Sequence, residues 1–301
     1  IIEAATGIQN AQMANMEEDT SNEILQEFIA KNPRASTLDA LRYRKAESLY
    51  QSGDYQTALQ NFEQYVRISS KDELKDDALF YVAESRRNLG QTEEAKEAYN
   101  TLIARYPNSE RSATAVAILA QQAFSEAQYQ ESLQLYQKLE DFGSQYQQDA
   151  WIGQAESYSA MGNYEQAAAY FNQVQKIRPD NSAAAIGLGI LALRSGDYAA
   201  ADSLLLPVAN SDMTENGARA TYFLALSKDE QNQREEAIQW LGKVNVLYGI
   251  YGEWVTRSGL KSIEWLLEEG KKGQAAEVLQ EMKKIYPQSP YTQQAENLIN
   301  N

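Results

Sequence analysis

The residues that most often carry out chemistry in proteins are missing from this chain. Its 301 residues include no cysteine and no histidine. Thiol nucleophiles, imidazole bases, disulfides and the usual ligands of zinc and copper are therefore excluded together. Catalysis would have to rely on Asp, Glu, Tyr, Ser or Lys, and no nucleophile, base and orienting partner can be assembled from them at a recognisable spacing. We expect a protein that is not an enzyme and has no cofactor or metal.

Paired carboxylates are the next candidates for acid–base chemistry. Adjacent acidic residues occur at Asp76/Asp77, Glu93/Glu94, Glu235/Glu236 and Glu268/Glu269. Neighbouring residues on a helix point about 100° apart, so the two carboxylates of each pair cannot face one substrate. These pairs indicate solvated helix faces.

One glycine pattern, Gly187-x-Gly189-x-x-Ala192, formally matches a dinucleotide-binding sequence. Binding a pyrophosphate requires a strand before the glycines and a helix that starts at them. Here the glycines fall inside a predicted helix, so they indicate close packing between helices.

The elements that must position any site are clearest between Gln148 and Asp180. This stretch contains the pattern Trp151-x-x-Gln154-Ala155-x-x-Tyr158, then Gly162, Ala167-x-x-x-Phe171 and Pro179. Apolar residues recur at helical spacing on both sides of Gly162, which predicts two amphipathic helices joined by a tight turn.

The same pattern recurs along the chain at intervals of 34 to 38 residues. The positions equivalent to Gly162 are Gly53, Gly90, Ala127, Gly196, Asn232 and Gly270. A small residue stands seven positions before all but the last of these seven anchors, and another stands five positions after every one. Such spacing predicts a stack of helical hairpins with small residues where helices cross.

These residues resemble the tetratricopeptide repeat (TPR) over nearly the whole chain. The resemblance implies an all-α fold, a right-handed α-α superhelix or TPR solenoid. We divide it into an atypical unit at 1–36, seven hairpins at 37–288, and a C-terminal capping helix at 289–301 that begins at Ser289-Pro290.

Two places interrupt the repeat. Pro207 predicts that the second helix of the fifth hairpin kinks or stops near Leu206, with residues 210–217 as a long connection. Residues 249–252 (Gly-Ile-Tyr-Gly) predict a second loop.

In this family the first helix of each hairpin lines a concave groove, at fixed positions before the anchor. The same register gives this chain a stripe of aromatic, aliphatic and basic residues, edged with acidic ones, that could hold a peptide. The predicted groove residues are Tyr43, Tyr50, Phe80, Arg87, Phe124, Ile152, Ile186, Ile190, Leu193, Arg219, Tyr222 and Arg257. The alternative for each of them is packing against the neighbouring hairpin.

The net charge and the hydropathy of the chain exclude some classes of binding partner. The net charge of −15 argues against binding nucleic acid through phosphates and against adsorption to an anionic membrane. The longest apolar run, Ala183 to Leu193, is too short to insert into a bilayer. A protein or peptide partner is therefore expected, and the sequence does not indicate an oligomeric state.

The junctions Tyr106-Pro107-Asn108-Ser109 and Tyr286-Pro287-Gln288-Ser289 resemble those of bacterial cell-envelope TPR proteins, such as the Tol-Pal accessory protein and the lipoprotein of the β-barrel assembly machinery. That likeness implies the bacterial periplasm or cell envelope, with the cytoplasm as the alternative. The function we expect is a non-catalytic scaffold that binds a peptide or protein segment in its groove. The alternatives are an accessory domain of a larger enzyme or sensor, and a glycan-binding solenoid favoured by 19 tyrosines.

Overall fold

A computed structural model describes Glu27 and residues 39–69 and 74–300 of the chain. These residues form helices and short connections, with no strand among them. The predicted unit at 1–36 lies outside the described residues, apart from Glu27. Within the described ranges the fold is all-helical, as predicted.

The fifteen helices of the described ranges follow one another in seven sequential pairs and a final single helix. The pairs are α3 (Asp39–Gln51) with α4 (Tyr55–Ile68), α5 (Lys75–Asn88) with α6 (Thr92–Arg105), α7 (Glu110–Ser125) with α8 (Tyr129–Glu140), α9 (Gln147–Ala160) with α10 (Tyr164–Ile177), α11 (Ser182–Arg194) with α12 (Tyr198–Ser211), α13 (Glu215–Glu230) with α14 (Arg234–Leu247), and α15 (Gly252–Glu268) with α16 (Lys272–Ile285). The single helix is α17 (Pro290–Asn300).

The turn inside each pair contains the predicted anchor in the left-handed region. Gly162 has φ 81°, and the other four anchor glycines lie between 75° and 85°. Ala127 and Asn232 adopt the same conformation, at 59° and 62°, without the freedom of glycine. The register read from the sequence is therefore correct in all seven pairs.

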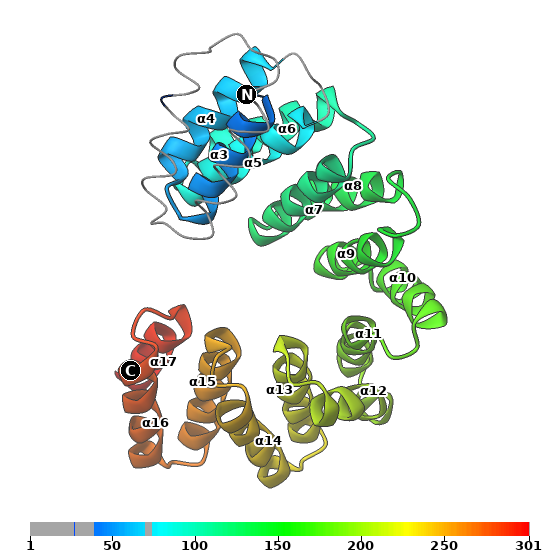
Figure 1. Ribbon diagram of the computed structural model, residues 1–301. Helices are drawn as coiled ribbons and strands as arrows, with labels where there is room; N and C mark the ends of the chain where they lie inside the picture. Colours follow the sequence, from blue (N-terminus) through cyan, green and yellow to red (C-terminus); the bar gives the residue numbers. More distant parts are fainter. Residues whose placement is uncertain (1–26, 28–38, 70–73, 301) are drawn as a thin grey trace. The chain divides into compact units, whose positions relative to one another are not determined.

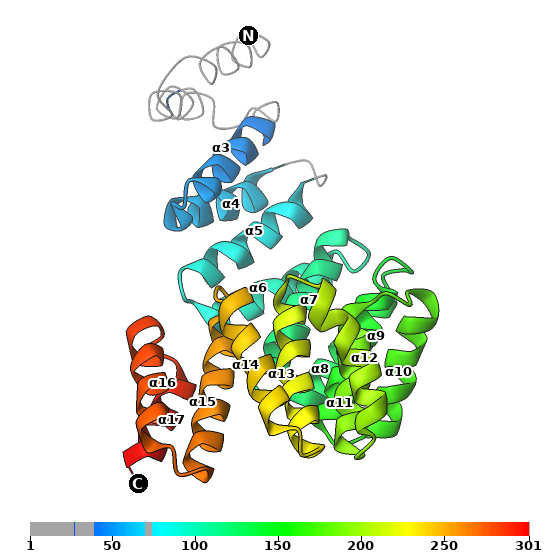
Figure 2. The ribbon, with the colours of Figure 1, turned by 90° about the horizontal axis from the view of Figure 1, so that it is seen from below.

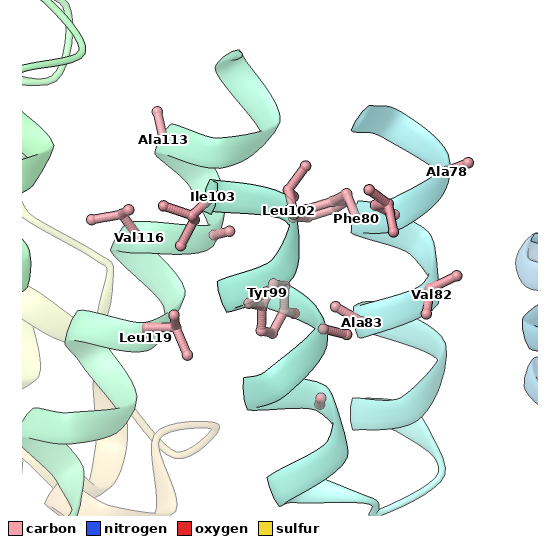
Figure 3. Packing of buried hydrophobic residues seen from close by; sticks show 14 of the residues in the cluster. Ala78, Phe80, Val82, Ala83, Tyr99, Leu102, Ile103, Ala113, Val116 and Leu119 are labelled. Atoms are coloured by element: carbon pink, nitrogen blue, oxygen red, sulfur yellow. The ribbon is translucent and has the colours of Figure 1, made fainter. Parts of the chain in front are cut away.

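The small residues of the repeat lie where helices cross. Ala155 and Ala167 are fully buried, and so are the equivalent Ala83 on α5 and Ala120 on α7. Figure 3 shows Phe80 and Ala83 of α5 facing Tyr99 and Leu102 of α6, with Val116 and Leu119 of α7 beyond them. Bulky side chains thus fill the space around close backbone contacts, as in other repeat proteins.

Gly187 and Gly189 confirm the packing interpretation of the glycine pattern. Both lie inside α11 and are buried. A Cβ atom at Gly187 would lie 2.3 Å from Phe171, and one at Gly189 would lie 2.7 Å from Leu205. Each glycine makes room for the large residue of a second helix, and neither begins a helix where a phosphate could bind.

The helix does not stop at Pro207, because α12 continues through the proline to Ser211. A helix that passes a proline loses one backbone hydrogen bond. The flanking Leu205 and Val208 are buried in the core, which holds the helix together on both sides.

The predicted long connection at 210–217 is wrong, since residues 212–214 alone join α12 to α13. Gly217, which the sequence places in the loop, lies inside α13 and is buried. A Cβ atom there would lie 1.7 Å from the carbonyl oxygen of Asp212. The loop predicted at residues 249–252 is present, because α14 ends at Leu247 and α15 begins at Gly252.

The chain divides into two compact units, residues 1–150 and 151–301, with the boundary inside α9. In the first unit, α3 packs on α5 and α5 packs on α7, in addition to the contacts within pairs. In the second unit, α11, α13, α15 and α17 contact one another in the same succession. Figures 1 and 2 both show α15, α16 and α17 side by side. We call the surface made by the odd-numbered helices of each unit its first-helix face.

Candidate functional site

On the first-helix face of the first unit, two predicted groove residues are buried, which corrects their assignment. Tyr43 and Phe80 are 6% and 7% exposed. The Tyr43 hydroxyl donates to the Asp77 carboxylate, which also accepts from Arg111 Nε. Arg111 lies 4.9 Å from the ring centroid of Phe80. These contacts join α3, α5 and α7, so Tyr43 and Phe80 hold neighbouring hairpins together.

A second polar cluster surrounds Glu84 on α5, whose side chain is buried. Arg87 binds it with two nitrogens, at 3.1 Å from Oε1 and 2.6 Å from Oε2. The Tyr99 hydroxyl donates to Oε1, and the Tyr50 hydroxyl lies 3.4 Å from Oε2. The predicted residues Tyr50 and Arg87 are thus brought together, but their polar atoms are occupied by a carboxylate of the protein itself.

The hydrogen bonds of this cluster determine its protonation. Burial alone raises the pKa of the Glu84 carboxyl, but the hydrogen bonds from Arg87 and Tyr99 outweigh burial and bring it below its ordinary value. Burial and the bond to Glu84 raise the pKa of Tyr99 well above its usual range. The cluster therefore consists of an ionised carboxylate and neutral tyrosines. Its contacts connect helices of the protein, so its role is to stabilise the fold.

The remaining predicted residue of this unit, Phe124, is half-buried at the end of α7. Its ring packs edge-on against Tyr129 of the paired helix, with centroids 5.3 Å apart. It therefore contributes to the turn between α7 and α8.

In the second unit, Ile186 is another correction. It is fully buried in the core cluster that also contains Leu205 and Leu224. Ile190 and Leu193, on the same helix, are half-buried against that cluster. Ile152 is half-buried on α9, beside Phe171. The apolar patch predicted on α11 is thus mostly an interface between hairpins.

Arg219 is bound within its own unit. Its Nη1 lies 2.9 Å from Oε1 of Glu156, 63 residues earlier in the chain. The ion pair joins α9 to α13 and involves two half-exposed side chains. The charge of this predicted groove residue is therefore already paired within the protein.

Tyr222 and Arg257 lie together in a cleft of about 320 Å³ between α13, α15 and α17. We call it the tyrosine cleft. Its walls include Tyr222, Phe223, Leu226, Arg257, Lys261 and Tyr291. Aromatic and aliphatic walls with a few charged groups are the usual composition of a binding site for a side chain.

Arg257 is held firmly within this cleft. Its Nε donates to the Tyr291 hydroxyl at 2.6 Å, and its guanidinium carbon lies 4.8 Å from the Trp254 ring and 5.2 Å from the Tyr291 ring. The nearest carboxylate, that of Glu253, lies 3.6 Å from Nε. In the part of the chain that the structure describes, the two terminal nitrogens of Arg257 have no hydrogen-bond acceptor.

A second cleft of about 510 Å³ adjoins the first at the turn after α11. We call it the turn cleft. It is lined by Arg194, Tyr198, Leu226, Asp229, Glu230 and Lys261, among others. Leu226 and Lys261 line both clefts, which makes them two parts of one groove across α13 and α15.

Two groups of the tyrosine cleft have shifted pKa values. Burial raises the pKa of Tyr222 despite the opposing charges of Arg257 and Lys261. Burial lowers the pKa of Lys261, but the hydrogen bond to Glu264 at 2.9 Å and the negative charges of Glu264 and Asp229 together raise it above its ordinary value, so the amine stays charged. At neutral pH the cleft therefore combines a neutral phenol at Tyr222 with the Arg257 guanidinium and the ion pair of Lys261 and Glu264, which also lines it.

Sequence reasoning missed Tyr291 and Lys261. Tyr291 was assigned to the capping helix, yet it follows Arg257 by 34 residues, the separation that also joins Tyr43 to Asp77 and Asp77 to Arg111. Extending the repeat register into α17 would have found it. Lys261 lies four positions after the predicted Arg257, and no sequence signal marks it.

The described residues offer little for other kinds of site. They contain no group of acidic residues able to hold a metal ion. None of the helices in these ranges is both long and apolar enough to cross a membrane.

Comparisons with known proteins agree with the helical-repeat fold. Residues 39–69, 77–109 and 158–220 match tetratricopeptide repeat families. No curated protein matches the sequence.

Solved structures resemble the fold at low sequence identity. A tetratricopeptide repeat protein from Parabacteroides merdae has a TM-score of 0.70 at 15% identity, covering 87% of this chain and 99% of its own. The anaphase-promoting complex (APC/C) hetero-tetramer Cut9–Hcn1 has a TM-score of 0.58 at 14% identity, over 94% of this chain and 52% of that one. The type IV pilus biogenesis factor PilW has a TM-score of 0.54 at 15% identity, over 72% and 96%. Residues 39–69, 77–109 and 158–220 thus match tetratricopeptide repeat models, and the fold of the chain is that of tetratricopeptide repeat proteins.

Proposed function

We propose that this protein is a non-catalytic scaffold that binds an extended segment of a partner protein along the groove formed by the tyrosine cleft and the turn cleft. The observation that carries the proposal is the tyrosine cleft itself. It combines half-buried aromatic walls with a guanidinium group whose terminal nitrogens have no hydrogen-bond acceptor among the described residues.

The cleft has the features of a binding hot spot. Tyrosine, tryptophan and arginine dominate the energetics of protein interfaces, because they bury large areas and lose little conformational freedom. The ring centroids of Tyr222 and Trp254 are 5.7 Å apart. The Arg257 guanidinium contacts the rings of Trp254 and Tyr291. Both side chains are therefore ordered before a ligand arrives, which lowers the entropic cost of binding.

The first-helix face of the first unit is a weaker candidate. There Asp77 and Glu84 already bind the donors on neighbouring helices. A ligand would have to break these contacts in order to bind.

The family supports the type of function. Tetratricopeptide repeats are generally interaction modules and typically have no catalytic activity. One of the similar structures, Cut9–Hcn1, is an assembly of two kinds of protein chain. We transfer the general role of a scaffold to this chain, and no particular partner.

Selection of random twelve-residue peptides on the immobilised full chain tests the proposal. We expect enriched peptides whose affinity falls about thirtyfold on Tyr222→Ala, a loss of about 2 kcal/mol. Tyr170→Ala is the matched control, since Tyr170 is half-buried on α10 and stacks on Tyr158 away from both clefts. Melting temperatures measured in parallel separate binding from folding. Peptides that bind a folded Tyr222→Ala variant with unchanged affinity would refute the proposed groove.

We also propose a location in the bacterial cell envelope. The support is the pair of Tyr-Pro-x-Ser junctions at 106–109 and 286–289, which resemble those of envelope proteins of this family. Fractionation of cells that express the complete gene tests this, and recovery in the cytoplasmic fraction would contradict it.

A further inference from the structure

We propose that the segment bound in this groove is dipolar: a basic side chain enters the turn cleft, an apolar side chain packs on Leu226, and an acidic side chain binds Arg257. This inference rests on the proposed function and adds the chemistry and the order of the ligand. Three features of the groove support it: the free end of Arg257, the charge balance of the turn cleft, and the distance between them.

At the acidic-binding end, the orientation of Arg257 determines what it can accept. Tyr291 and Glu253 both contact Nε, so neither uses the two terminal nitrogens. A planar carboxylate can accept from both terminal nitrogens at once, which is the strongest form of this contact. Two other arginines of the unit use a terminal nitrogen to bind a carboxylate. Arg219 binds Glu156, and Arg234 binds both Asp229 and Glu268.

At the other end, the charged groups of the turn cleft leave one carboxylate free. Asp229 is bound by Arg234, Lys261 by Glu264, and Arg194 lies over the Tyr164 ring with Nη1 at 3.1 Å from its hydroxyl. Glu230 is exposed and accepts only from the Tyr198 hydroxyl at 3.5 Å, with no ion pair in the described part of the chain.

Helix dipoles favour the same polarity. The turn cleft lies where α11 ends at Arg194 and α13 ends at Glu230. The C-terminal carbonyl groups of a helix carry partial negative charge, which favours a cation. Tyr291, beside Arg257, is in the first turn of α17, where the partial charge is positive. Helix ends and side chains therefore favour a cation at the turn cleft and an anion at the tyrosine cleft.

The spacing of the two ends sets the length of the ligand motif. Glu230 is the last residue of α13, whereas Arg257 lies in the second turn of α15. At a rise of about 1.5 Å per residue and a separation of about 10 Å between packed helices, the two charges lie roughly 15–20 Å apart. About five or six residues of extended chain span this distance. Leu226, which lines both clefts, lies between the charges and can accept the apolar residue.

The experiment uses the peptides selected on the wild-type chain and repeats the selection on Arg257→Glu and Glu230→Lys. We expect wild-type peptides to carry a basic and an acidic residue about five or six positions apart, on either side of an apolar one. We expect Arg257→Glu to weaken these peptides about tenfold and to select a basic residue at the acidic position. Glu230→Lys should likewise weaken these peptides and should select an acidic residue at the basic position. Arg178→Glu is the control, because Arg178 is exposed after α10, outside both clefts, and should leave the selection unchanged.

The outcomes separate the two proposals. Peptides that need Tyr222 but show no paired charges, or that keep their charges on both variants, overturn the dipolar ligand and leave the scaffold intact. Peptides that do not need Tyr222 overturn both proposals. A change of selection on Arg178→Glu equal to that on Arg257→Glu assigns the effect to net charge and also overturns the dipolar ligand.

Discussion

In the first unit, the carboxylates of Asp77 and Glu84 bind hydroxyl and guanidinium groups on the neighbouring helices, and the first-helix face is filled by the protein itself. In the second unit, Arg257 stands in the register of Asp77 and donates from Nε to the Tyr291 hydroxyl, with Glu253 at 3.6 Å from the same nitrogen. Glu230, at the end of α13, has no ion pair in the described part of the chain. The difference lies in the residue found 34 positions along the chain. Asp77 meets Arg111 there, and Arg257 meets Tyr291. Both arginines bind through Nε, Arg111 to a carboxylate and Arg257 to a phenol. Among the described residues, Glu253 is the carboxylate paired with Arg257, at 3.6 Å from Nε, beyond hydrogen-bond distance.

Repeat proteins thus use one set of positions for two purposes. A residue on a first helix lies between neighbouring hairpins or faces a ligand, depending on the residue that the next hairpin places beside it. Four changes test this comparison, in order of decreasing effect.

The largest effect is expected from Ile186→Ala in the second unit. Ile186 is fully buried, so the variant loses the transfer free energy of three carbons and leaves a cavity, about 3 kcal/mol in total. Ile190→Ala, on the same helix but half-buried, should cost about 1 kcal/mol. Denaturant unfolding followed by hydrogen exchange in the second unit measures both. Equal losses would mean that Ile186 and Ile190 are equally buried in solution, contrary to the structure.

The second effect concerns the cluster that fills the first unit. Glu84→Ala removes the acceptor of both Arg87 and the buried Tyr99 hydroxyl, and should destabilise the first unit by about 2 kcal/mol. Peptide affinity should be unchanged, because Glu84 lies outside both clefts. A loss of peptide binding by a folded Glu84→Ala variant would show that the first unit takes part in recognition.

Acid should weaken the same cluster. The pKa of Glu84 is lower in the folded protein than its ordinary value, so the unfolded chain takes up its proton first as the pH falls. The stabilisation is complete above about pH 5 and is lost as the pH falls from the ordinary carboxyl pKa, about 4.3, through the lowered folded value. Hydrogen exchange of α5 and α6 between pH 3 and pH 6 measures it. Glu84→Gln should remove this part of the pH dependence, and an unchanged profile would assign it to other carboxyl groups.

The sequence was sufficient for the scaffold because the repeat constrains it at fixed positions. Anchors, small residues and bulky residues each recur, so the turns, the helix pairs and the close packing of Gly187 could be predicted. Pro207 and Gly217 were misread because their local signals are those of a loop, whereas burial of Leu205 and contact with Asp212 hold both residues in helices.

The candidate site was predictable only in part, for a related reason. Register places Tyr222 and Arg257 on the first-helix face, and the structure places them in one cleft. Register alone could not distinguish them from Tyr43, Phe80 and Ile186, because burial depends on how neighbouring hairpins pack. The partners of Arg219 and Arg257 depend in the same way on contacts 63 and 34 residues apart.

The smallest effect compares the two anchors that are not glycine, one in each unit. Ala127 and Asn232 have φ values of 59° and 62°, a conformation that costs alanine about 1 kcal/mol and asparagine less, because its side chain tolerates the left-handed region. Ala127→Gly should therefore raise the free energy of unfolding of the first unit by about 1 kcal/mol. Asn232→Gly should change the free energy of unfolding of the second unit by only a few tenths of about 1 kcal/mol. Ala104→Gly, at an exposed helical position on α6, is the control and should destabilise by about 1 kcal/mol. Denaturant midpoints measure all three. If Ala127→Gly destabilises as Ala104→Gly does, the turn after α7 is not left-handed in solution, and the common register of the two units ends at α7.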